Sequence, residues 1–282
     1  MSRDAVRAQL ARRGLRAERE RGQNFLFDPR VAEQIAALAP VAPGDAVIEI
    51  GPGLGILTRA LAARARKVAA IEIDAGLVRT LREEGDLPPH VDLIHADALD
   101  VDLAALADSL GPPVRVVANL PYAVSSPLLR KLLDLRGRVA GSLVLVQREV
   151  AMRLVARPNT RDYGSLAVLH ALCVRVERVR DLPPSCFFPA PRVVSTLVRA
   201  TPLDPAPLTA DEMLHVERIV RAAFGTRRKT LPNALAAGLR PGPDPEFLHG
   251  VLDALGIDPR CRAEALEPGQ LLALARALAG RC

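Results

Sequence analysis

Between residues 46 and 147 the chain repeats one pattern, a short run of apolar, often β-branched residues followed by a stretch with helical spacing. The apolar runs occupy residues 46–50, 68–73, 91–95, 114–118 and 142–147. Near-continuous Val, Ile and Leu runs that alternate with helices are typical of parallel strands covered on both faces. The pattern predicts an α/β domain with a Rossmann-like, doubly wound and mostly parallel sheet.

Apolar and polar residues alternate in two later stretches, residues 170–180 and 193–200, as they do in antiparallel strands. We expect these stretches to close the sheet at one edge. Residues 201–208 contain three prolines and are predicted to form a linker. Amphipathic helical patterns, separated by Gly and Pro, then follow near residues 209–224, 229–237, 245–255 and 268–280. The sequence therefore predicts a sheet domain over residues 24–200 and a small all-helical domain over residues 209–282.

Positive charge is concentrated at the N-terminus. The chain carries a net charge of +6, and residues 1–23, which include the adjacent Arg12 and Arg13, hold seven Arg against three acidic residues. Residues 201–282 hold ten charges of each sign. A basic arm over residues 1–23 suits a polyanion such as RNA, because phosphate contacts release counterions. A solvated tail without a ligand fits the charge equally well, and the three acids disfavour a mitochondrial transit peptide.

The composition also bears on compartment and metals. No apolar run approaches the roughly 20 residues that cross a bilayer, and the first residues lack the apolar centre of a secretory signal. The four cysteines are widely spread and form no C-x-x-C pair, which predicts reduced thiols and no metal site. We therefore expect a soluble, cytoplasmic protein that does not contact membranes.

A glycine-rich loop, EIGPGLG at residues 49–55, follows the first predicted strand and precedes a helix. Gly51, Gly53 and Gly55 allow a tight turn and let a ligand lie against main-chain atoms that a Cβ would block. A nicotinamide enzyme is the poorer interpretation, because the last glycine of G-x-G-x-x-G falls one position later than Gly55. The loop predicts a nucleotide-like cofactor of another class.

Polar residues follow the next three predicted strands. Glu72 ends the second strand, Asp97 follows the third and Asn119 follows the fourth. Because the carboxyl ends of parallel strands face one crevice, these residues should meet the glycine loop at a single site. Glu72 has the position of an acid that accepts hydrogen bonds from ribose hydroxyls, with Asp74 as the competing acid, and Asp97 could accept one from an adenine amino group.

The four residues Asn119-Leu120-Pro121-Tyr122 suit chemistry on an adenine amino nitrogen, whose lone pair is delocalised into the ring. The Asn119 side-chain oxygen and the Leu120 carbonyl can accept its two N–H bonds and turn the lone pair toward a methyl donor. Pro121 biases Leu120 toward an extended conformation, and Tyr122 offers a ring on which a base can stack. Catalysis would then rest on positioning, without a strong base.

These motifs, together with GQNFL at residues 22–26, FFPAPRV at residues 187–193 and FGTRRKTL at residues 224–231, resemble the ribosomal RNA adenine N6,N6-dimethyltransferases. The resemblance spans residues 22 to 233, and its closest match is the KsgA-type branch. That branch dimethylates two adjacent adenosines near the 3′ end of small-subunit (16S) ribosomal RNA. The resemblance implies S-adenosylmethionine as cofactor, the small ribosomal subunit as partner and a monomeric enzyme.

The resemblance also implies roles for individual residues. Asn24 and Leu26 would contact the cofactor together with Gly51, Gly53, Gly55, Glu72, Asp97 and Asn119. Phe187 would stack on the flipped adenine opposite Tyr122, with Phe188 as the competing aromatic residue. The cations Arg227, Arg228 and Lys229 would grip RNA phosphates, although their charge alone fits a solvated helix start equally well.

Four alternatives remain at this stage. The same chemistry could act on large-subunit ribosomal RNA, as in macrolide-resistance methyltransferases, or on DNA adenines, although no sequence-reading domain is recognisable. A non-catalytic nucleic-acid-binding relative, similar to mitochondrial transcription factors, would have no need of the cofactor residues. Failure to bind S-adenosylmethionine would revive a nicotinamide oxidoreductase.

Overall fold

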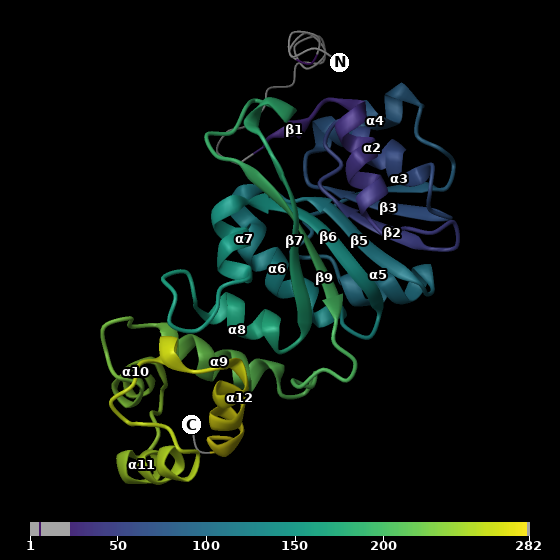
Figure 1. Cartoon of the computed structure of the whole chain (residues 1–282). Coiled ribbons are helices and arrows are strands. Elements are labelled where there is room, and N and C mark those ends of the chain that lie inside the picture. Colours follow the sequence, from purple (N-terminus) through teal and green to yellow (C-terminus); the bar gives the residue numbers. More distant parts are fainter. Residues whose placement is uncertain (1–5, 7–22, 281–282) are drawn as a thin grey trace. The chain divides into compact units, whose positions relative to one another are not determined.

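The computed structural model of the chain describes Val6 and residues 23–280. The chain forms two compact units, of which the first comprises residues 1–151 and 177–202 and the second residues 152–176 and 203–282 (Figure 1). Within the described residues, no helix has both the length and the apolar character needed to cross a bilayer. Arg12 and Arg13 of the N-terminal arm lie outside the described residues.

A seven-stranded sheet in the order β4-β3-β2-β5-β6-β9-β7 is the centre of the first unit (Figure 1). Its strands are β2 (Ala46–Ile50), β3 (Lys67–Glu72), β4 (Val91–His95), β5 (Val114–Asn119), β6 (Val139–Gln147), β7 (Val174–Leu182) and β9 (Ser195–Pro202). Strands β2 to β6 pair in parallel, and β9 pairs antiparallel with β6. The expected doubly wound, mostly parallel sheet is confirmed.

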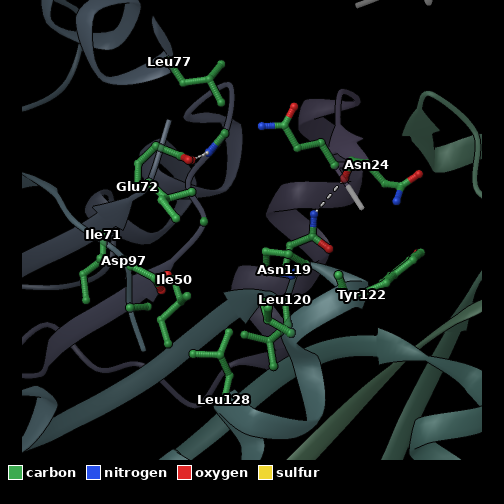
Figure 2. Close-up of a pocket in the computed structure, with 18 of the residues that line it drawn as sticks. Asn24, Ile50, Ile71, Glu72, Leu77, Asp97, Asn119, Leu120, Tyr122 and Leu128 are labelled. Carbon is green, nitrogen blue, oxygen red and sulfur yellow. Dashed lines mark hydrogen bonds between the residues drawn. The ribbon is translucent and has the colours of Figure 1, made fainter. Parts of the chain in front are cut away.

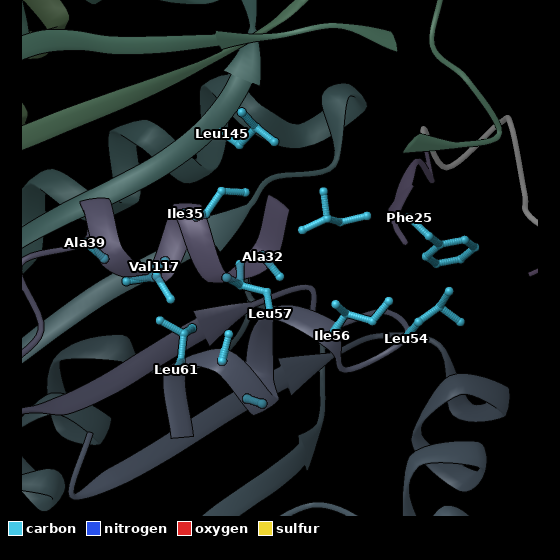
Figure 3. Packing of buried hydrophobic residues seen from close by; sticks show 14 of the residues in the cluster. Phe25, Ala32, Ile35, Ala39, Leu54, Ile56, Leu57, Leu61, Val117 and Leu145 are labelled. Carbon is cyan, nitrogen blue, oxygen red and sulfur yellow. The ribbon is translucent and has the colours of Figure 1, made fainter. Parts of the chain in front are cut away.

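Helices α2 (Pro29–Leu38) and α3 (Ile56–Ala62) cover one face of this sheet (Figure 3). Ile35 and Leu61 pack with Val117 and Leu145 in one buried cluster. Each fully buried aliphatic side chain of this size contributes about 1.5–3 kcal/mol relative to its exposed state. This cluster fixes α3, and with α3 the glycine loop that leads into it.

Two of the remaining helices of this unit, α4 (Ala75–Glu84) and α5 (Leu103–Leu110), begin at side-chain caps. The unit also contains α6 (Ser125–Leu132), followed by a 3₁₀ turn at Leu133–Leu135. The Asp74 carboxylate accepts hydrogen bonds from the N–H groups of Gly76 and Leu77, and Asp102 caps α5 in the same way through Ala105. Such caps satisfy N–H groups that have no partner within the helix.

A small second sheet joins distant parts of the first unit. Strand β1 (Phe25–Leu26) pairs antiparallel with β8 (Phe187–Phe188), which follows a 3₁₀ turn at Pro184–Cys186. Gln23 and Asn24, which directly precede β1, therefore lie close to the segment between β8 and β9. Sequence periodicity cannot reveal so short a pairing, because two residues carry no period.

The second unit is helical and includes more of the chain than the sequence predicts. It contains α8 (Ser165–Ala171), α9 (Met213–Phe224), α10 (Leu231–Gly238), α11 (Pro245–Ala254), a 3₁₀ turn at Ala263–Ala265 and α12 (Pro268–Ala277), while α7 (Arg148–Leu154) spans the division. Residues 152–176, which the sequence places in the sheet domain, belong here. The Tyr163 hydroxyl donates to the Leu266 carbonyl at 2.8 Å, and its ring meets Phe224 edge-on.

Two predicted segments differ from the observed elements. The strand expected over residues 170–180 begins only at Val174, because residues 170 and 171 end α8, where the buried His170 ring lies 2.8 Å from the Leu166 carbonyl. The expected linker at residues 201–208 is partly strand, since β9 continues to Pro202, and Leu208 is fully buried. In both places packing decides where local pattern is ambiguous.

Candidate active site

A cavity of about 340 Å³ lies at the carboxyl ends of the parallel strands, within the first unit (Figure 2). This is the crevice in which ligands of open α/β sheets bind. Six of the predicted cofactor residues line it, namely Asn24, Gly51, Gly53, Glu72, Asp97 and Asn119. Glu72 and Asp97 lie on one side of the cavity in this view, and Asn24, Asn119 and Tyr122 on the other (Figure 2). Acids therefore line one side of the cavity, and amides line the other.

The glycine loop approaches the cavity with its backbone in the left-handed region. Gly51 has φ of 73° and Gly53 has φ of 57°, which L side chains rarely adopt. A Cβ on Gly53 would lie 2.9 Å from the ring of Phe25. The loop and β1 are thus in direct contact, and neither position tolerates a side chain without rearrangement.

Glu72 is the acid that the structure places at the cavity wall. Its carboxylate accepts hydrogen bonds from the backbone N–H of Gly53 at 3.1 Å and from that of Asp74 at 3.0 Å. Burial raises the pKa of Glu72, and these two N–H groups oppose the rise. Because a carboxylate has about four acceptor positions, each oxygen retains capacity for one more donor. Two vicinal hydroxyls of a ribose are donors of the required kind.

The two nearby aspartates have different positions. Asp97 follows β4 and lines the cavity, where its Oδ1 accepts a hydrogen bond from the Leu99 N–H at 2.8 Å. Asp74 lies outside the cavity lining and caps α4. Glu72 and Asp74 are the two candidate acids at the end of β3. Of these two, Glu72 is the one that lines the cavity.

Asn119, the last residue of β5, is held by a long-range hydrogen bond. Its Nδ2 donates to the backbone carbonyl of Asn24 at 3.0 Å (Figure 2). A carbonyl oxygen only accepts, so this bond assigns the amide orientation. The Asn119 Oδ1 consequently points away from Asn24 and remains an acceptor within the cavity.

The next two residues have a constrained backbone. The Leu120 N–H donates to the Leu145 carbonyl at 3.1 Å, which ties the segment to β6. Pro121 has φ of −59° and ψ of 130° and restricts Leu120 as well. Leu120 and Pro121 both line the cavity. The peptide that carries the predicted second acceptor is therefore fixed by the sheet on one side and by the proline ring on the other.

Tyr122 begins the 3₁₀ turn at Tyr122–Val124, and its hydroxyl lies 2.6 Å from the Ser195 hydroxyl. Ser195 is fully buried at the start of β9. Burial raises the pKa of Tyr122, so the phenol stays protonated near neutral pH. The ring is held at its far end and presents its side to the cavity, an arrangement suited to stacking against a flat ligand.

Three predicted site residues have other positions. Leu26 and Gly55 do not line this cavity, since Leu26 belongs to the core and Gly55 precedes α3 with its Cβ position against Leu81. Phe187 is fully buried in the core and lies outside the cavity lining. The structure therefore does not place its ring opposite Tyr122. Phe188 is the more exposed of the two phenylalanines.

Several cavity residues escape sequence reasoning because they are apolar. Ile50, Ile71, Ile73, Leu77 and Leu128 line the cavity, and Ile73 has 48% of its surface exposed although it is a large hydrophobic residue. The sequence could have indicated that Ile73 lines the cavity, because Ile73 directly follows Glu72 at a strand end. Ser195 carries no such signal, because only the fold brings it to Tyr122.

The three cations expected to bind RNA lie in the second unit and differ in their contacts. The Arg227 guanidinium donates to the Arg161 carbonyl and lies 3.5 Å from the Glu264 carboxylate. Arg228 and Lys229 are exposed, and within residues 23–280 neither has an ion-pair partner. The segment at residues 152–176 adds four arginines and one acid to the neutral C-terminal region, so the helical unit is net basic.

The cavity chemistry fits a ligand that combines hydrogen-bond donors, positive charge and apolar surface. Acidic and amide acceptors face it, its walls are apolar, and no Lys or Arg lines it among the described residues. Nor do His, Cys, Asp and Glu gather in groups of three or more that could hold a metal in the described part of the chain. What the site offers is positioning between fixed acceptors and apolar walls.

Comparison with known proteins identifies relatives over nearly the whole chain. The sequence profile of the family described as ribosomal RNA adenine dimethylase matches residues 14–279. A protein of Anaeromyxobacter sp. (strain K) named ribosomal RNA small subunit methyltransferase A is 44% identical over 280 residues, which cover 96% of this chain and 97% of that protein. A protein of the same name from Aromatoleum aromaticum is 41% identical and covers 94% and 96%.

Solved structures of methyltransferases also resemble this chain over most of its length. A dimethyladenosine transferase from Plasmodium falciparum superposes with a TM-score of 0.73 at 25% identity, covering 91% of this chain and 98% of that one. The 23S ribosomal RNA methyltransferase ErmE superposes with a TM-score of 0.64 at 27% identity, covering 90% and 99%. The likeness therefore extends over both units of the chain.

Proposed function

Because this chain belongs to the ribosomal RNA adenine dimethylase family, we propose that it methylates adenosines of small-subunit (16S) ribosomal RNA, with S-adenosylmethionine as the donor. The product is N6,N6-dimethyladenosine at two adjacent positions near the 3′ end, formed during maturation of the small subunit. Relatives named small subunit methyltransferase A, at 41% and 44% identity over nearly the whole chain, support this target.

The cofactor residues in this proposal are those that line the first cavity. Glu72 accepts hydrogen bonds from the ribose hydroxyls, Asp97 accepts one from the adenine amino group, and Gly51 and Gly53 leave room beside their backbone. Two buried N–H donors already on Glu72 hold its carboxylate in place. When bound, S-adenosylmethionine supplies a methyl group made electrophilic by its sulfonium.

The Asn119 amide orientation is the observation that carries the catalytic proposal. With Nδ2 committed to the Asn24 carbonyl, Oδ1 is the amide atom left to accept a hydrogen bond from a ligand. Oδ1 and the Leu120 carbonyl together hold the two N–H bonds of the target amino group and orient its lone pair. Tyr122, anchored by Ser195, stacks against the base. The chain thus contributes positioning and hydrogen bonding, and the released proton leaves only after the nitrogen is alkylated.

Outside the cavity, the proposal includes RNA contacts in both parts of the chain. The basic arm with Arg12 and Arg13 binds phosphates, as do Arg228 and Lys229 of the helical unit, whereas Arg227 also holds residues 161 and 264 together. The partner is the small ribosomal subunit. The protein acts as a monomer in the cytoplasm.

The test uses small subunits isolated from cells that lack this methylation. Incubation with the protein and isotopically labelled S-adenosylmethionine should produce labelled N6,N6-dimethyladenosine, measured by mass spectrometry of digested nucleosides. Free large-subunit RNA, given in parallel, should stay unlabelled. Labelled large-subunit RNA would favour the second candidate, for which the superposition on ErmE is the supporting observation. Binding of RNA without any labelled product would indicate a non-catalytic relative.

A further inference from the structure

A second cavity, of about 730 Å³, adjoins the first and shares Gln23, Asn24, Tyr122 and Ala123 with it. Beyond these four residues, its walls come from the end of β6 and from the segment between β8 and β9. Except for Asn24 and Tyr122, none of the residues given a role above lines it. Both cavities are within the size range of about 300–1,000 Å³ that is typical of small-molecule sites.

The two cavities differ in charge. Glu72 and Asp97 are the charged residues that line the first cavity, and Arg192 is the charged residue that lines the second, within the described part of the chain. Arg192 is exposed and forms no ion pair or side-chain hydrogen bond with residues 23–280. An acidic cavity suits a cationic ligand, and a cavity with an unpaired guanidinium suits an anionic ligand such as a phosphodiester.

The walls of the second cavity also suit a flat, apolar ring. Tyr122 lines it together with Pro189, Pro191 and Val193 of the loop between β8 and β9. Val193 has 43% of its surface exposed, one of three large hydrophobic side chains so exposed in the described part of the chain. Phe187 is fully buried and does not line this cavity, so this loop, and not the Phe187 ring, supplies apolar surface beside Tyr122 there.

Gln147 is the neutral polar residue that the mechanism above does not use. It is the last residue of β6 and pairs in register with Ser195, the residue that holds the Tyr122 hydroxyl. Its side-chain amide lines the cavity and has no hydrogen-bond partner among residues 23–280. An amide nitrogen there can donate to a ring nitrogen of a base stacked on Tyr122.

We propose that two residues of the second cavity recognise the target nucleotide: the Gln147 side chain donates to a ring nitrogen beside the reacting amino group, and Arg192 binds the adjoining phosphate. This inference rests on the proposed function and names the residues that select its substrate. Adenine has unprotonated N1 and N7, whereas guanine carries a proton on N1 and an oxygen in place of the amino group. Gln147 and Asn119 together therefore select adenine by complementary donors and acceptors.

The first experiment tests Arg192 with a matched control. In Arg192→Ala, the KM for undermethylated small subunits should rise on the order of tenfold, and the slope of log affinity against log salt should fall by about one. Arg192→Lys should restore much of the affinity. The control is Arg79→Ala, because Arg79 is an exposed arginine of α4 that lines neither cavity. Affinity for S-adenosylmethionine, measured by calorimetry, should equal that of the wild type in all three variants.

The second experiment tests Gln147. Gln147→Leu, which keeps the size but removes the donor, should lower kcat/KM on small subunits on the order of tenfold and leave S-adenosylmethionine binding unchanged. Subunits reconstituted with 1-deazaadenosine or 7-deazaadenosine at the target positions identify the acceptor. One of these analogues should lower the kcat/KM of the wild type by a similar factor. The same analogue should not lower the kcat/KM of Gln147→Leu any further.

Equal KM values and salt slopes for wild type and Arg192→Ala, or additive losses for Gln147→Leu with both analogues, would overturn the inference. If the wild-type protein still transfers methyl groups to small subunits when those results are obtained, only this inference has failed. Wild-type protein that transfers none to small subunits would instead remove the proposed function.

Discussion

Single hydrogen bonds decide the chemistry of this site at the residue scale. The Asn119 amide is oriented by a carbonyl 95 positions earlier in the chain, and Tyr122 by a hydroxyl 73 positions later. Asn24 lies in the GQNFL segment and Ser195 at the start of β9, both far from the NLPY segment at residues 119–122 in the sequence. A side chain whose free rotation is removed before the ligand arrives loses less entropy on binding. The residues that reach the substrate therefore depend on residues that do not.

Asn119→Ala tests the acceptor role. The variant should lose methyl transfer by about 100-fold or more in kcat, as is typical when one preorganised hydrogen-bonding group of an active site is removed. Its affinity for S-adenosylmethionine should change far less, because Glu72 and Asp97 are untouched. Single-turnover assays and calorimetry measure the two quantities. A turnover number equal to the wild type would remove Asn119 from the mechanism.

Glu49 provides a test of pH dependence. Its side chain is 1% exposed, its Oε2 has no hydrogen-bond partner, and burial raises its pKa from 4.5 to about 8. The folded protein therefore binds a proton between these pH values that the unfolded chain has released, so stability falls as pH rises through this window. Each unit of pKa difference corresponds to 1.36 kcal/mol, which gives a loss on the order of 5 kcal/mol above pH 8.

Glu49→Gln should abolish this part of the pH dependence. Denaturant unfolding between about pH 5 and pH 9 should show a free energy of unfolding that declines in the wild type and declines less in the variant. Glu33→Gln serves as control, because Glu33 is 52% exposed, and should reproduce the wild-type curve. Parallel curves for wild type and Glu49→Gln would mean that Glu49 ionises freely in the folded protein.

At the element scale, the site depends on strand ends and on one close approach. β2, β3, β4 and β5 each deliver a residue or loop to the cavity because parallel strands end at the same edge. The short strand β1 adds Asn24 and Phe25 from outside the sheet, and it fits only because Gly53 lacks a side chain. The glycine loop is thus required by packing as well as by the ligand.

Gly53→Ala and Gly85→Ala compare a glycine in the glycine loop with one outside it, and so test whether the loop must lack a side chain. Both glycines have φ near 60°, so both substitutions carry a backbone penalty of about 1–2 kcal/mol. A Cβ on Gly53 meets Phe25 at 2.9 Å, whereas a Cβ on Gly85 meets nothing within 4 Å. S-adenosylmethionine affinity by calorimetry should fall at least tenfold in Gly53→Ala and stay at the wild-type value in Gly85→Ala. Equal affinities would show that the loop tolerates a side chain.

Charge acts at the scale of the whole molecule. The sheet unit supplies the cavities, while the excess of positive charge lies in the N-terminal arm and in the helical unit. Residues 152–176 contribute to that excess although they precede β9 in the chain, because they pack with α9 and α12. Phosphate contacts of this kind give affinity without base specificity. Base selection therefore has to come from the cavities.

Deletion of residues 1–20 tests the arm. The deletion removes six arginines and three acids, and it should weaken binding to small subunits and flatten its salt dependence. Thermal unfolding, measured in parallel, reports any loss of core packing, because the deletion also removes Val6, which is fully buried in the core cluster. Filter binding at several salt concentrations measures the slope. An identical slope would show that the arm makes no phosphate contacts.

The sequence by itself determined the parallel sheet, because runs such as residues 46–50 and 114–118 have a length and composition that only buried parallel strands combine. It also determined that Glu72, Asp97 and Asn119 share one crevice, because the carboxyl ends of parallel strands coincide. Both conclusions depend on local pattern and on a general rule of topology, so a single amino-acid sequence is sufficient to reach them.

Only the tertiary structure decided the rest. It assigned residues 152–176 to the helical unit, buried Phe187 in the core and brought Ser195 and Asn24 to the two side chains they orient. These outcomes depend on contacts between positions tens of residues apart, and such contacts leave no period or motif in a single sequence. Local pattern fixes which elements form, whereas packing energy chooses which side chains face the ligand and which fill the core.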